Sequence, residues 1–142
     1  MAYEMFGIEV DDSLNLKDNY KEIFIKNRRS KNNSFDDLYK EYCEYNELDP
    51  DGGFEKEFLD DYDDDGCLCG FYGLITTLIN EELGNSWFEY EDSCVGVAAT
   101  LPENDNAKND IPSRERIAEI LHDYFDDLTD DVIEPNWLEI NI

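Results

Sequence analysis

The chain has 142 residues, which suits a single acidic domain over residues 1–142, with two small lobes at about 1–66 and 67–142 as the alternative division. Hydrophobic residues make up 41% and aromatic residues 13% of the sequence, enough to bury a core, so the composition excludes a disordered acidic tail. The 37 acidic and 11 basic residues give a formal net charge of −26, which argues against direct binding to nucleic acid.

The N-terminal segment is predicted to form a strand and then a helix. Tyr3–Val10 alternates polar and apolar side chains as a strand does, with a slip in the alternation at Gly7. Leu16–Arg28 carries apolar residues at helical spacing and predicts the first helix. The polar stretch that follows, Arg29–Asn33, predicts a loop.

Two shorter helices are predicted next. Ser34 is a suitable N-cap, with Asp37 in the third helical position. The apolar face of the helix that it begins consists of Phe35, Leu38, Tyr39, Tyr42 and Cys43. Asp49–Gly53 has the sequence DPDGG and predicts a turn. A short helix after this turn is expected to end in the acidic run before Gly66, and its inner face is Phe54, Phe58, Leu59 and Tyr62.

The second half of the chain is predicted to begin with a buried helix and a hairpin. Phe71–Leu83 is mostly apolar, and Gly84 would close the helix. Trp87–Glu91 and Cys94–Leu101 predict the two strands of a β-hairpin. The second of these strands is small and apolar enough to be central in a sheet.

The C-terminal third is predicted to contain a surface loop at Pro102–Pro112, an amphipathic helix at Ser113–Asp130 and a last strand at Trp137–Ile142. The inner face of the helix would be Ile117, Ile120, Leu121, Tyr124, Phe125 and Leu128. The fold class is therefore α+β, with about five helices. We expect an N-terminal helical lobe that packs with a small antiparallel sheet and with the C-terminal amphipathic helix.

The cysteine content and the apolar runs indicate the compartment. Four Cys in a chain of 142 residues do not make a disulfide scaffold, and no apolar run approaches the roughly 20 residues of a membrane span. The N-terminus shows no basic segment followed by an apolar stretch, as a signal peptide would. We expect a cytoplasmic protein with reduced thiols and no membrane contact.

The acidic residues are concentrated in two stretches. Residues 36–65 hold fourteen acids and two bases and residues 115–134 hold eight acids and one base, whereas residues 1–31 are balanced. Five carboxylates share the outer side of the predicted last helix: Glu119, Asp123, Asp126, Asp127 and Asp130. Side chains three and four residues apart on a helix lie about 5–6 Å from one another. A net charge of −26 equals that of roughly 44 Å of duplex, and a globule of this size spans about 40 Å, so mimicry of DNA is physically feasible.

Two simpler explanations of the acidity are also open. Acidic helix faces are commonly just solvated, and adaptation to high salt also enriches carboxylates. The sequence is rich in Asn, Ile, Tyr and Phe rather than in Ala, Val and Gly, which argues against salt adaptation. We therefore favour a function that needs a strongly basic partner.

One segment partly matches a calcium-binding loop. Asp61, Asp63, Asp65 and Gly66 occupy the first, third, fifth and sixth positions of an EF-hand loop. The twelfth position, where calcium needs a bidentate Glu, is Tyr72, so tight calcium binding is not expected, although the clustered carboxylates would bind divalent ions weakly. Four thiols are poorly spaced for zinc: Cys43, Cys67, Cys69 and Cys94. We predict no metal and no cofactor.

The sequence offers no set of residues for catalysis. It has no Gly-rich phosphate loop and no nucleophile elbow, and its one histidine, His122, is expected to be solvated beside Asp123. We predict that the protein is not an enzyme. Lys26–Lys31 is the only basic cluster, and the favoured interpretation is that it pairs with the acidic faces of the same chain. A self-association contact and an exposed loop are the alternatives.

The acidic runs Asp60–Asp65 and Asp123–Asp131, the chain length and the lack of catalytic motifs resemble the DNA-mimic inhibitors of phages and mobile elements, the anti-CRISPR and anti-restriction proteins. Such proteins share no single fold, so the resemblance is one of composition. It implies that carboxylates of this chain occupy the basic DNA-binding groove of a CRISPR effector or a restriction complex, in the host cytosol if a phage encodes the protein. The carboxylates expected to contact this basic, nucleic-acid-binding partner protein are Asp36, Asp37, Glu41, Glu44, Asp60, Asp61, Asp63, Asp64, Asp65, Glu119, Asp123, Asp126, Asp127, Asp130 and Asp131.

A rival class is the immunity protein, an acidic antidote that plugs a basic toxin nuclease. Such a protein would concentrate its charge on one patch and anchor it with aromatic side chains such as Tyr or Trp. A third and weaker alternative is a calcium-responsive acidic module. Charge alone does not separate the first two classes, and it leaves the oligomeric state, monomer or dimer, open.

Overall fold

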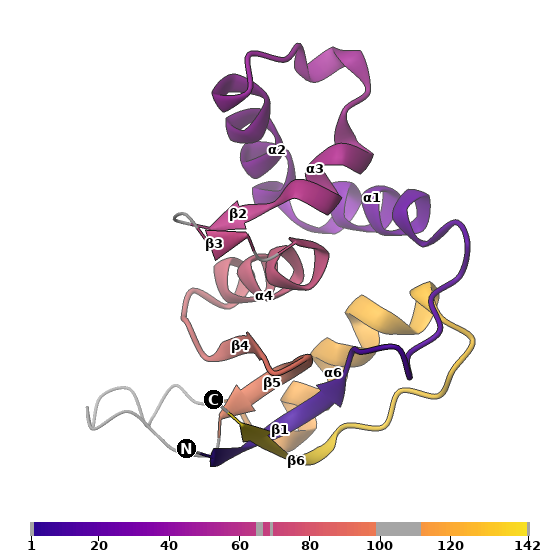
Figure 1. The fold of residues 1–142 in the computed structure, drawn as a ribbon, viewed down its shortest axis with the longest axis vertical. Coiled ribbons are helices and arrows are strands. Elements are labelled where there is room, and N and C mark those ends of the chain that lie inside the picture. Colours follow the sequence, from indigo (N-terminus) through magenta and orange to yellow (C-terminus); the bar gives the residue numbers. More distant parts are fainter. Residues whose placement is uncertain (1, 65–66, 69, 99–111, 142) are drawn as a thin grey trace.

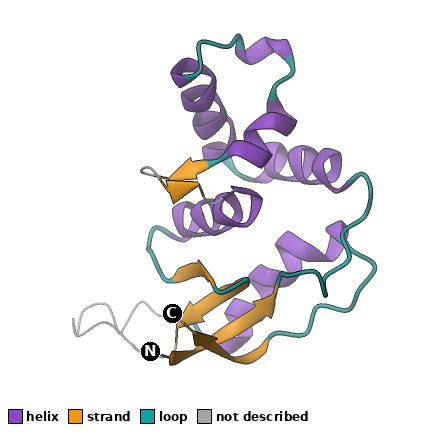
Figure 2. Cartoon of the chain, viewed as in Figure 1, coloured by secondary structure: helices purple, strands orange, loops and turns teal. Residues whose placement is uncertain are grey.

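The structure is a computed structural model, and it describes residues 2–64, 67–68, 70–98 and 112–141. Figure 1 shows helices α1 to α3 gathered at one end of the molecule and the sheet with helix α6 at the other. Helix α4 lies between the other N-terminal helices and the sheet (Figure 2). The chain is thus a mixed α+β protein with an N-terminal group of helices and a C-terminal helix, as the sequence predicts.

The sheet has the strand order β4-β5-β1-β6, and all neighbouring strands are antiparallel. Its strands are β1 at Ala2–Glu9, β4 at Phe88–Glu91, β5 at Cys94–Ala98 and β6 at Asn136–Asn141. All four predicted strands therefore pair in one sheet. The predicted hairpin is formed by β4 and β5, and β5 is central, as its small apolar residues predict.

Strand β1 is buried on both faces, which explains the irregular alternation around Gly7. Ile8 belongs to the main hydrophobic core, whereas Met5 packs in a second cluster with Cys94 and Ile140. Gly7 lies opposite Gly96 of β5, and a Cβ atom on Gly7 would lie 2.0 Å from the carbonyl oxygen of Val95. Glycine is required there because the two backbones approach too closely for any side chain.

The described part of the chain contains five α-helices. They are α1 at Tyr20–Lys31, α2 at Asn33–Tyr45, α3 at Glu55–Asp61, α4 at Gly70–Leu83 and α6 at Arg114–Phe125. Two 3-10 turns, η1 at Pro50–Gly52 and η2 at Asp126–Leu128, and a small hairpin of β2 at Asp63–Asp64 with β3 at Cys67–Leu68 complete the fold. None of the described helices is both long and apolar enough to cross a membrane.

One hydrophobic cluster joins the helical end of the molecule to the sheet. Aromatic rings form its helical part, where Phe24 and Phe71 meet edge to face with ring centroids 4.9 Å apart and Phe35 meets Phe58 at 5.7 Å. The same cluster continues through α4 to Phe88 of the sheet. Helix α4 is mostly buried, as its composition predicts, because it packs between the helices and the sheet.

The boundaries of the first two helices differ from the prediction. Helix α1 begins at Tyr20 rather than at Leu16, because Leu16 pairs with Thr129 in an isolated β-bridge. The predicted loop at Arg29–Asn33 is wrong, since α1 continues to Lys31 and the extended residue Asn32 alone separates it from α2. Ser34 is therefore inside α2 and is not its N-cap.

The last helix is shorter than predicted. Helix α6 begins after Ser113, whose hydroxyl accepts a hydrogen bond from the Arg116 amide, and it ends at Phe125 instead of Asp130. The chain then forms η2 and turns into the extended, buried residue Thr129. Residues 99–111 lie outside the described residues. They include the end of the predicted strand, at 99–101, and all of the predicted loop at 102–112 except residue 112.

Candidate partner-binding surface

The basic cluster at the end of α1 is used inside the protein. Arg28 is only 1% exposed, and its guanidinium stacks on the ring of Tyr124 with 3.8 Å between its Cζ atom and the ring centroid. It donates hydrogen bonds to Asn32 Oδ1 at 3.0 Å and to Asp123 Oδ2 at 3.3 Å. Asn32 in turn donates to the Tyr124 hydroxyl, which donates to Glu82. This network joins α1, α4 and α6.

The two bases that follow Arg28 also pair within the chain. Arg29 bridges Asp36 of α2 at 2.9 Å and Glu55 of α3 at 3.0 Å, and Lys31 reaches Asp123 at 2.9 Å. The favoured interpretation of the basic cluster, pairing with the chain's own acids, is therefore confirmed for these residues. Each pair removes a carboxylate from the set available to a partner.

Asp123 consequently has a perturbed pKa. Its partial burial alone would raise the pKa of the carboxyl, but the hydrogen bond from Lys31 and the positive charges of Arg28 and Lys31 outweigh this and lower the pKa below its ordinary value. The carboxylate is therefore held in its charged form by the chain's own bases. Asp123 supports the fold rather than lying free on the surface.

The other predicted contact residues near α6 are also engaged. Glu119 pairs with Arg116, Asp126 contacts His122 at 2.9 Å, and Asp127 accepts a hydrogen bond from Asn27. Two more carboxylates beyond η2 contact the segment before α1, where Asp130 lies 3.8 Å from Lys17 and Asp131 accepts from the Asn15 amide. Because α6 ends at Phe125, the predicted acidic side of the last helix, Glu119, Asp123, Asp126, Asp127 and Asp130, is not one continuous helical stripe.

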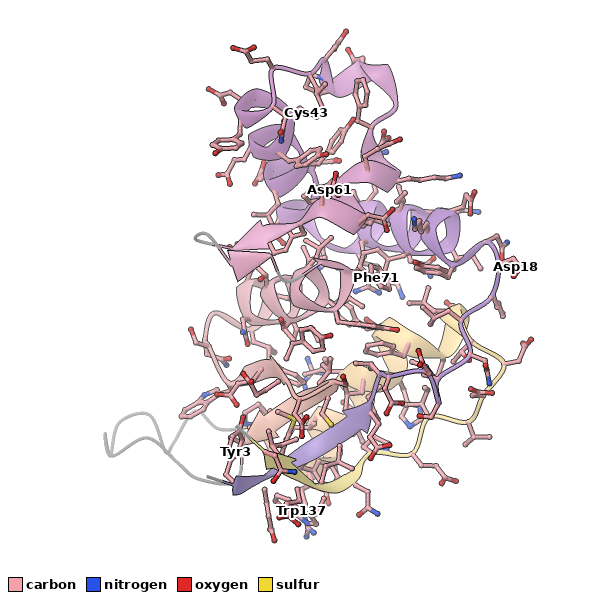
Figure 3. The ribbon with its side chains drawn as sticks, viewed as in Figure 1. Tyr3, Asp18, Cys43, Asp61, Phe71 and Trp137 are labelled. Carbon is pink, nitrogen blue, oxygen red and sulfur yellow. The ribbon has the colours of Figure 1, made fainter. Side chains whose placement is uncertain are left out.

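The acidic run after α3 is only partly described. Asp60 pairs with Lys21 at 2.6 Å, and Asp61 accepts a hydrogen bond from the Tyr42 hydroxyl. Asp63 and Asp64 form strand β2, and Asp65 lies outside the described residues. Figure 3 shows Asp61 at the junction between α3 and the β2–β3 hairpin, in the helical part of the molecule.

Among the predicted contact residues whose side chains the structure describes, those without an ion pair or hydrogen bond lie on helix α2. Asp37, Glu41 and Glu44 are exposed, and none of them has an ion-pair partner among the described residues. Their spacing places them within about 60° of one another around the helix axis. This α2 stripe lies opposite the buried side chains of the helix, and Asp36 beside it is half-buried through its pairing with Arg29.

An exposed aromatic side chain adjoins the α2 stripe. Tyr45, at the end of α2, is 89% exposed, the highest value among the large hydrophobic residues of the described chain. Large exposed aromatics of this kind are enriched at the centres of protein interfaces. Tyr45 is not among the contact residues predicted from the sequence, although its helical position off the apolar face of α2 indicates an exposed side chain.

The EF-hand-like segment does not have the form of a calcium loop in the described residues. Asp63 of β2 pairs with Leu68 of β3 in an antiparallel arrangement. The residue at position twelve, Tyr72, packs against the rings of Tyr90 and Phe125, and burial raises its pKa to about 12. Its side chain therefore belongs to the core. No group of three or more His, Cys, Asp or Glu in the described residues is placed to hold a metal ion.

Two of the four cysteines are placed by the structure. Cys43 is buried in the main core, at the helical end of the molecule (Figure 3), and Cys94 is buried in the second cluster on the sheet. Burial raises the pKa of the Cys94 thiol to about 11. The two thiols lie in different clusters and do not share a site.

Comparison with known proteins adds no relative. A scan against protein-family models, a search of curated proteins and a search of solved structures each found no match.

Proposed function

We propose that this protein is an acidic inhibitor that mimics nucleic acid and occupies the basic DNA-binding groove of a defence enzyme, a CRISPR effector or a restriction complex. The observation that supports it is the contrast between the two kinds of charge. Seven of the ten described Lys and Arg side chains form ion pairs within the chain, among them Arg28, Arg29 and Lys31, whereas the carboxylates of the α2 stripe are exposed and have no ion-pair partner among the described residues.

The geometry of the α2 stripe suits this role. Neighbouring carboxylates of the stripe are separated by four and three residues, or about 6 and 4.5 Å along the helix axis. Phosphates of one DNA strand follow one another at about 3.4 Å along the duplex axis, the same order of spacing. A row of Arg and Lys side chains that contacts a phosphate strand would therefore meet a carboxylate of α2 at comparable intervals.

A second candidate function is that of an immunity protein against a basic toxin nuclease. The observation in its favour is Tyr45, which lies exposed next to the α2 stripe and would serve as an aromatic anchor. Both candidates place the partner on α2. They differ in whether the partner is a DNA-binding defence complex or a toxin.

The test uses charge reversal on the α2 stripe. The triple variant Asp37→Lys, Glu41→Lys, Glu44→Lys should keep the fold, because all three side chains are exposed and unpaired among the described residues. A control with the same change in net charge is Asp12→Lys, Glu81→Lys, Glu139→Lys, three exposed residues on separate elements. Reversal of Asp123, by contrast, would place a lysine against the buried Arg28 and disturb the fold.

The assay measures competition between the protein and DNA for a captured host enzyme, by fluorescence anisotropy of a labelled duplex at 0.05 to 0.5 M salt. We expect the wild type and the control to displace DNA, with a steep loss at high salt, and the α2 triple variant to be at least tenfold weaker. Equal weakening of both variants, or a captured partner without nucleic-acid function, would contradict mimicry. A captured toxin nuclease would favour the immunity function.

A further inference from the structure

The pairing of β1 with β6 stops before β1 ends. Strand β6 pairs with β1 as far as Asn136, which lies opposite Gly7. If the same register continued, Glu134 would lie opposite Glu9. Pro135, between these two positions of β6, has no N–H group, and the strand assignment ends at Asn136. Among the described residues, the end of β1 therefore has no neighbouring strand on this side.

The backbone of Glu9 faces this open side. The Val10 amide donates to the Ser93 carbonyl at 2.8 Å, so the backbone groups of Val10 point toward β5. Backbone groups of successive residues in a strand point to opposite sides, which directs the amide and carbonyl of Glu9 toward the β6 side. That is where β6 has already ended. Glu9 thus presents one donor and one acceptor in the orientation that an added strand would use.

A groove of about 540 Å³ lies at this position. One wall is Gly7–Glu9, the other is Asp131–Glu134, and residues 13–15 also line it. Its lining includes apolar side chains from Leu14 and from Val132, which is 80% exposed. Three carboxylates line the groove, those of Glu9, Asp131 and Glu134, and none of its described lining residues is basic.

The groove is held in shape by the turn below it. Thr129, which is buried, donates from its hydroxyl to the Asn15 carbonyl and accepts from the Asp131 amide at 3.0 Å. Asp131 in turn accepts from the Asn15 amide at 2.9 Å, and the bridge between Leu16 and Thr129 ties the same two segments together. A groove that is formed in advance loses less entropy when a ligand binds.

We propose that this groove, which we call the β1 groove, binds a short, extended, basic segment of a partner protein by strand addition to Glu9. The backbone of the segment would exchange hydrogen bonds with Glu9, and its Arg or Lys side chains would meet the carboxylates of Glu9 and Glu134. An apolar side chain of the segment would cover Val132, which otherwise lies exposed to water. The inference rests on the proposed function only in taking the partner to be a basic protein.

The experiment uses the intact protein and the capped peptide acetyl-RVRVR-amide, with acetyl-EVEVE-amide as the reversed-charge control. Backbone amide signals of the ¹⁵N-labelled protein are followed by NMR during titration at 0.15 M salt. We expect the basic peptide to shift the signals of Gly7–Glu9 and Asp131–Glu134, and the acidic peptide to shift none. Shifts spread evenly over α2 and α6 would reveal unspecific charge attraction and overturn the proposal. Absence of any shift would also overturn it.

A matched pair of variants sharpens the test. Val132→Lys with Glu134→Lys changes one exposed apolar residue and one carboxylate of the groove, and Ser86→Lys with Glu81→Lys makes the same change in net charge at two exposed residues in and just after α4. We expect the groove variant to bind the basic peptide at least tenfold more weakly and the α4 variant to remain within about threefold of the wild type. Equal effects of the two variants on peptide binding would refute the proposal. Signals of the groove that shift with protein concentration in the absence of peptide would also refute it, because they would indicate that a second copy of the chain occupies the groove.

The two proposals can fail separately. The peptide titration involves no nucleic-acid enzyme, so it decides on the β1 groove whatever the partner is. The DNA competition assay with the α2 triple variant leaves the groove residues unchanged. Peptide binding without DNA competition would uphold the groove alone, and DNA competition without peptide binding would uphold mimicry alone.

Discussion

Replacement of Arg28 by methionine should destabilise the protein far more than the same change at Arg29. Arg28 is buried, stacks on Tyr124 and donates to Asn32, whose side-chain oxygen is buried with it. Methionine fills much of the same volume but supplies neither the charge nor a donor. The substitution therefore isolates the polar contribution of the guanidinium from its packing.

The expected magnitude follows from these contacts. A desolvated cation–π contact contributes about 2 kcal/mol, and a buried oxygen that loses its donor costs about 1–3 kcal/mol. Removal of a buried charge recovers part of this, so we expect a net loss of about 2–4 kcal/mol in the free energy of unfolding. For a chain of this length that corresponds to a fall of roughly 10 °C in the melting temperature. Arg29 is 39% exposed, so loss of its two ion pairs should cost about 1 kcal/mol.

Urea unfolding followed by far-ultraviolet circular dichroism, at pH 7 and 0.15 M salt, measures both variants on one scale. A double-mutant cycle of Arg28→Met with Tyr124→Leu then reports the coupling between the guanidinium and the ring. If Arg28→Met is no more damaging than Arg29→Met, the buried network does not hold the helices together as argued. A coupling energy near zero would refute the stacking contribution in particular.

Two further predictions concern pH and the sheet. Because the pKa of Asp123 is lower in the folded than in the unfolded protein, its carboxylate adds stability above the unfolded pKa of about 3.9. This stability is lost as the pH falls through the lower, folded pKa. The destabilisation caused by Asp123→Asn should therefore vanish between about pH 5 and pH 2. A constant difference between the two unfolding free energies over this range would contradict the pairing. Gly7→Ala should unfold the protein or lower the free energy of unfolding by about 3 kcal/mol or more, because the new Cβ would overlap the Val95 carbonyl. Gly53→Ala should lower it by only about 1–2 kcal/mol, because Gly53 has a φ of +81° but open space around it. Thermal melting measures both. Equal melting temperatures of the two variants would disprove the close-contact argument.

The types of the secondary-structure elements were readable from the sequence because they depend on local patterns. The apolar spacing of Phe35, Tyr39 and Cys43 identifies α2, and all three side chains are buried. The turn at Asp49–Gly53 forms as its residues predict, with Asp49 capping η1 and Gly53 in the left-handed region. Short-range propensity and periodicity were sufficient for these elements.

Helix ends were less predictable, because contacts from distant parts of the chain decide them. Leu16 has a suitable apolar spacing for α1, yet it joins Thr129 in a bridge. Asn32 lies in a polar stretch that local signals predict as a loop, yet it is the only residue between α1 and α2. Its side chain is held by hydrogen bonds with Arg28 and Tyr124. The last helix stops at Phe125 although the apolar pattern continues to Leu128.

The sequence by itself determined the acidity, the fold class and the four strands, since these follow from composition and local alternation. Which carboxylates remain free was decided only by the tertiary structure. Asp123 lies 92 positions from Lys31 in sequence, yet the two are in contact, while Glu41 has no ion-pair partner among the described residues. An ion pair needs the two charged groups within about 4 Å of each other, so pairing depends on how the helices pack and not on the order of residues along the chain.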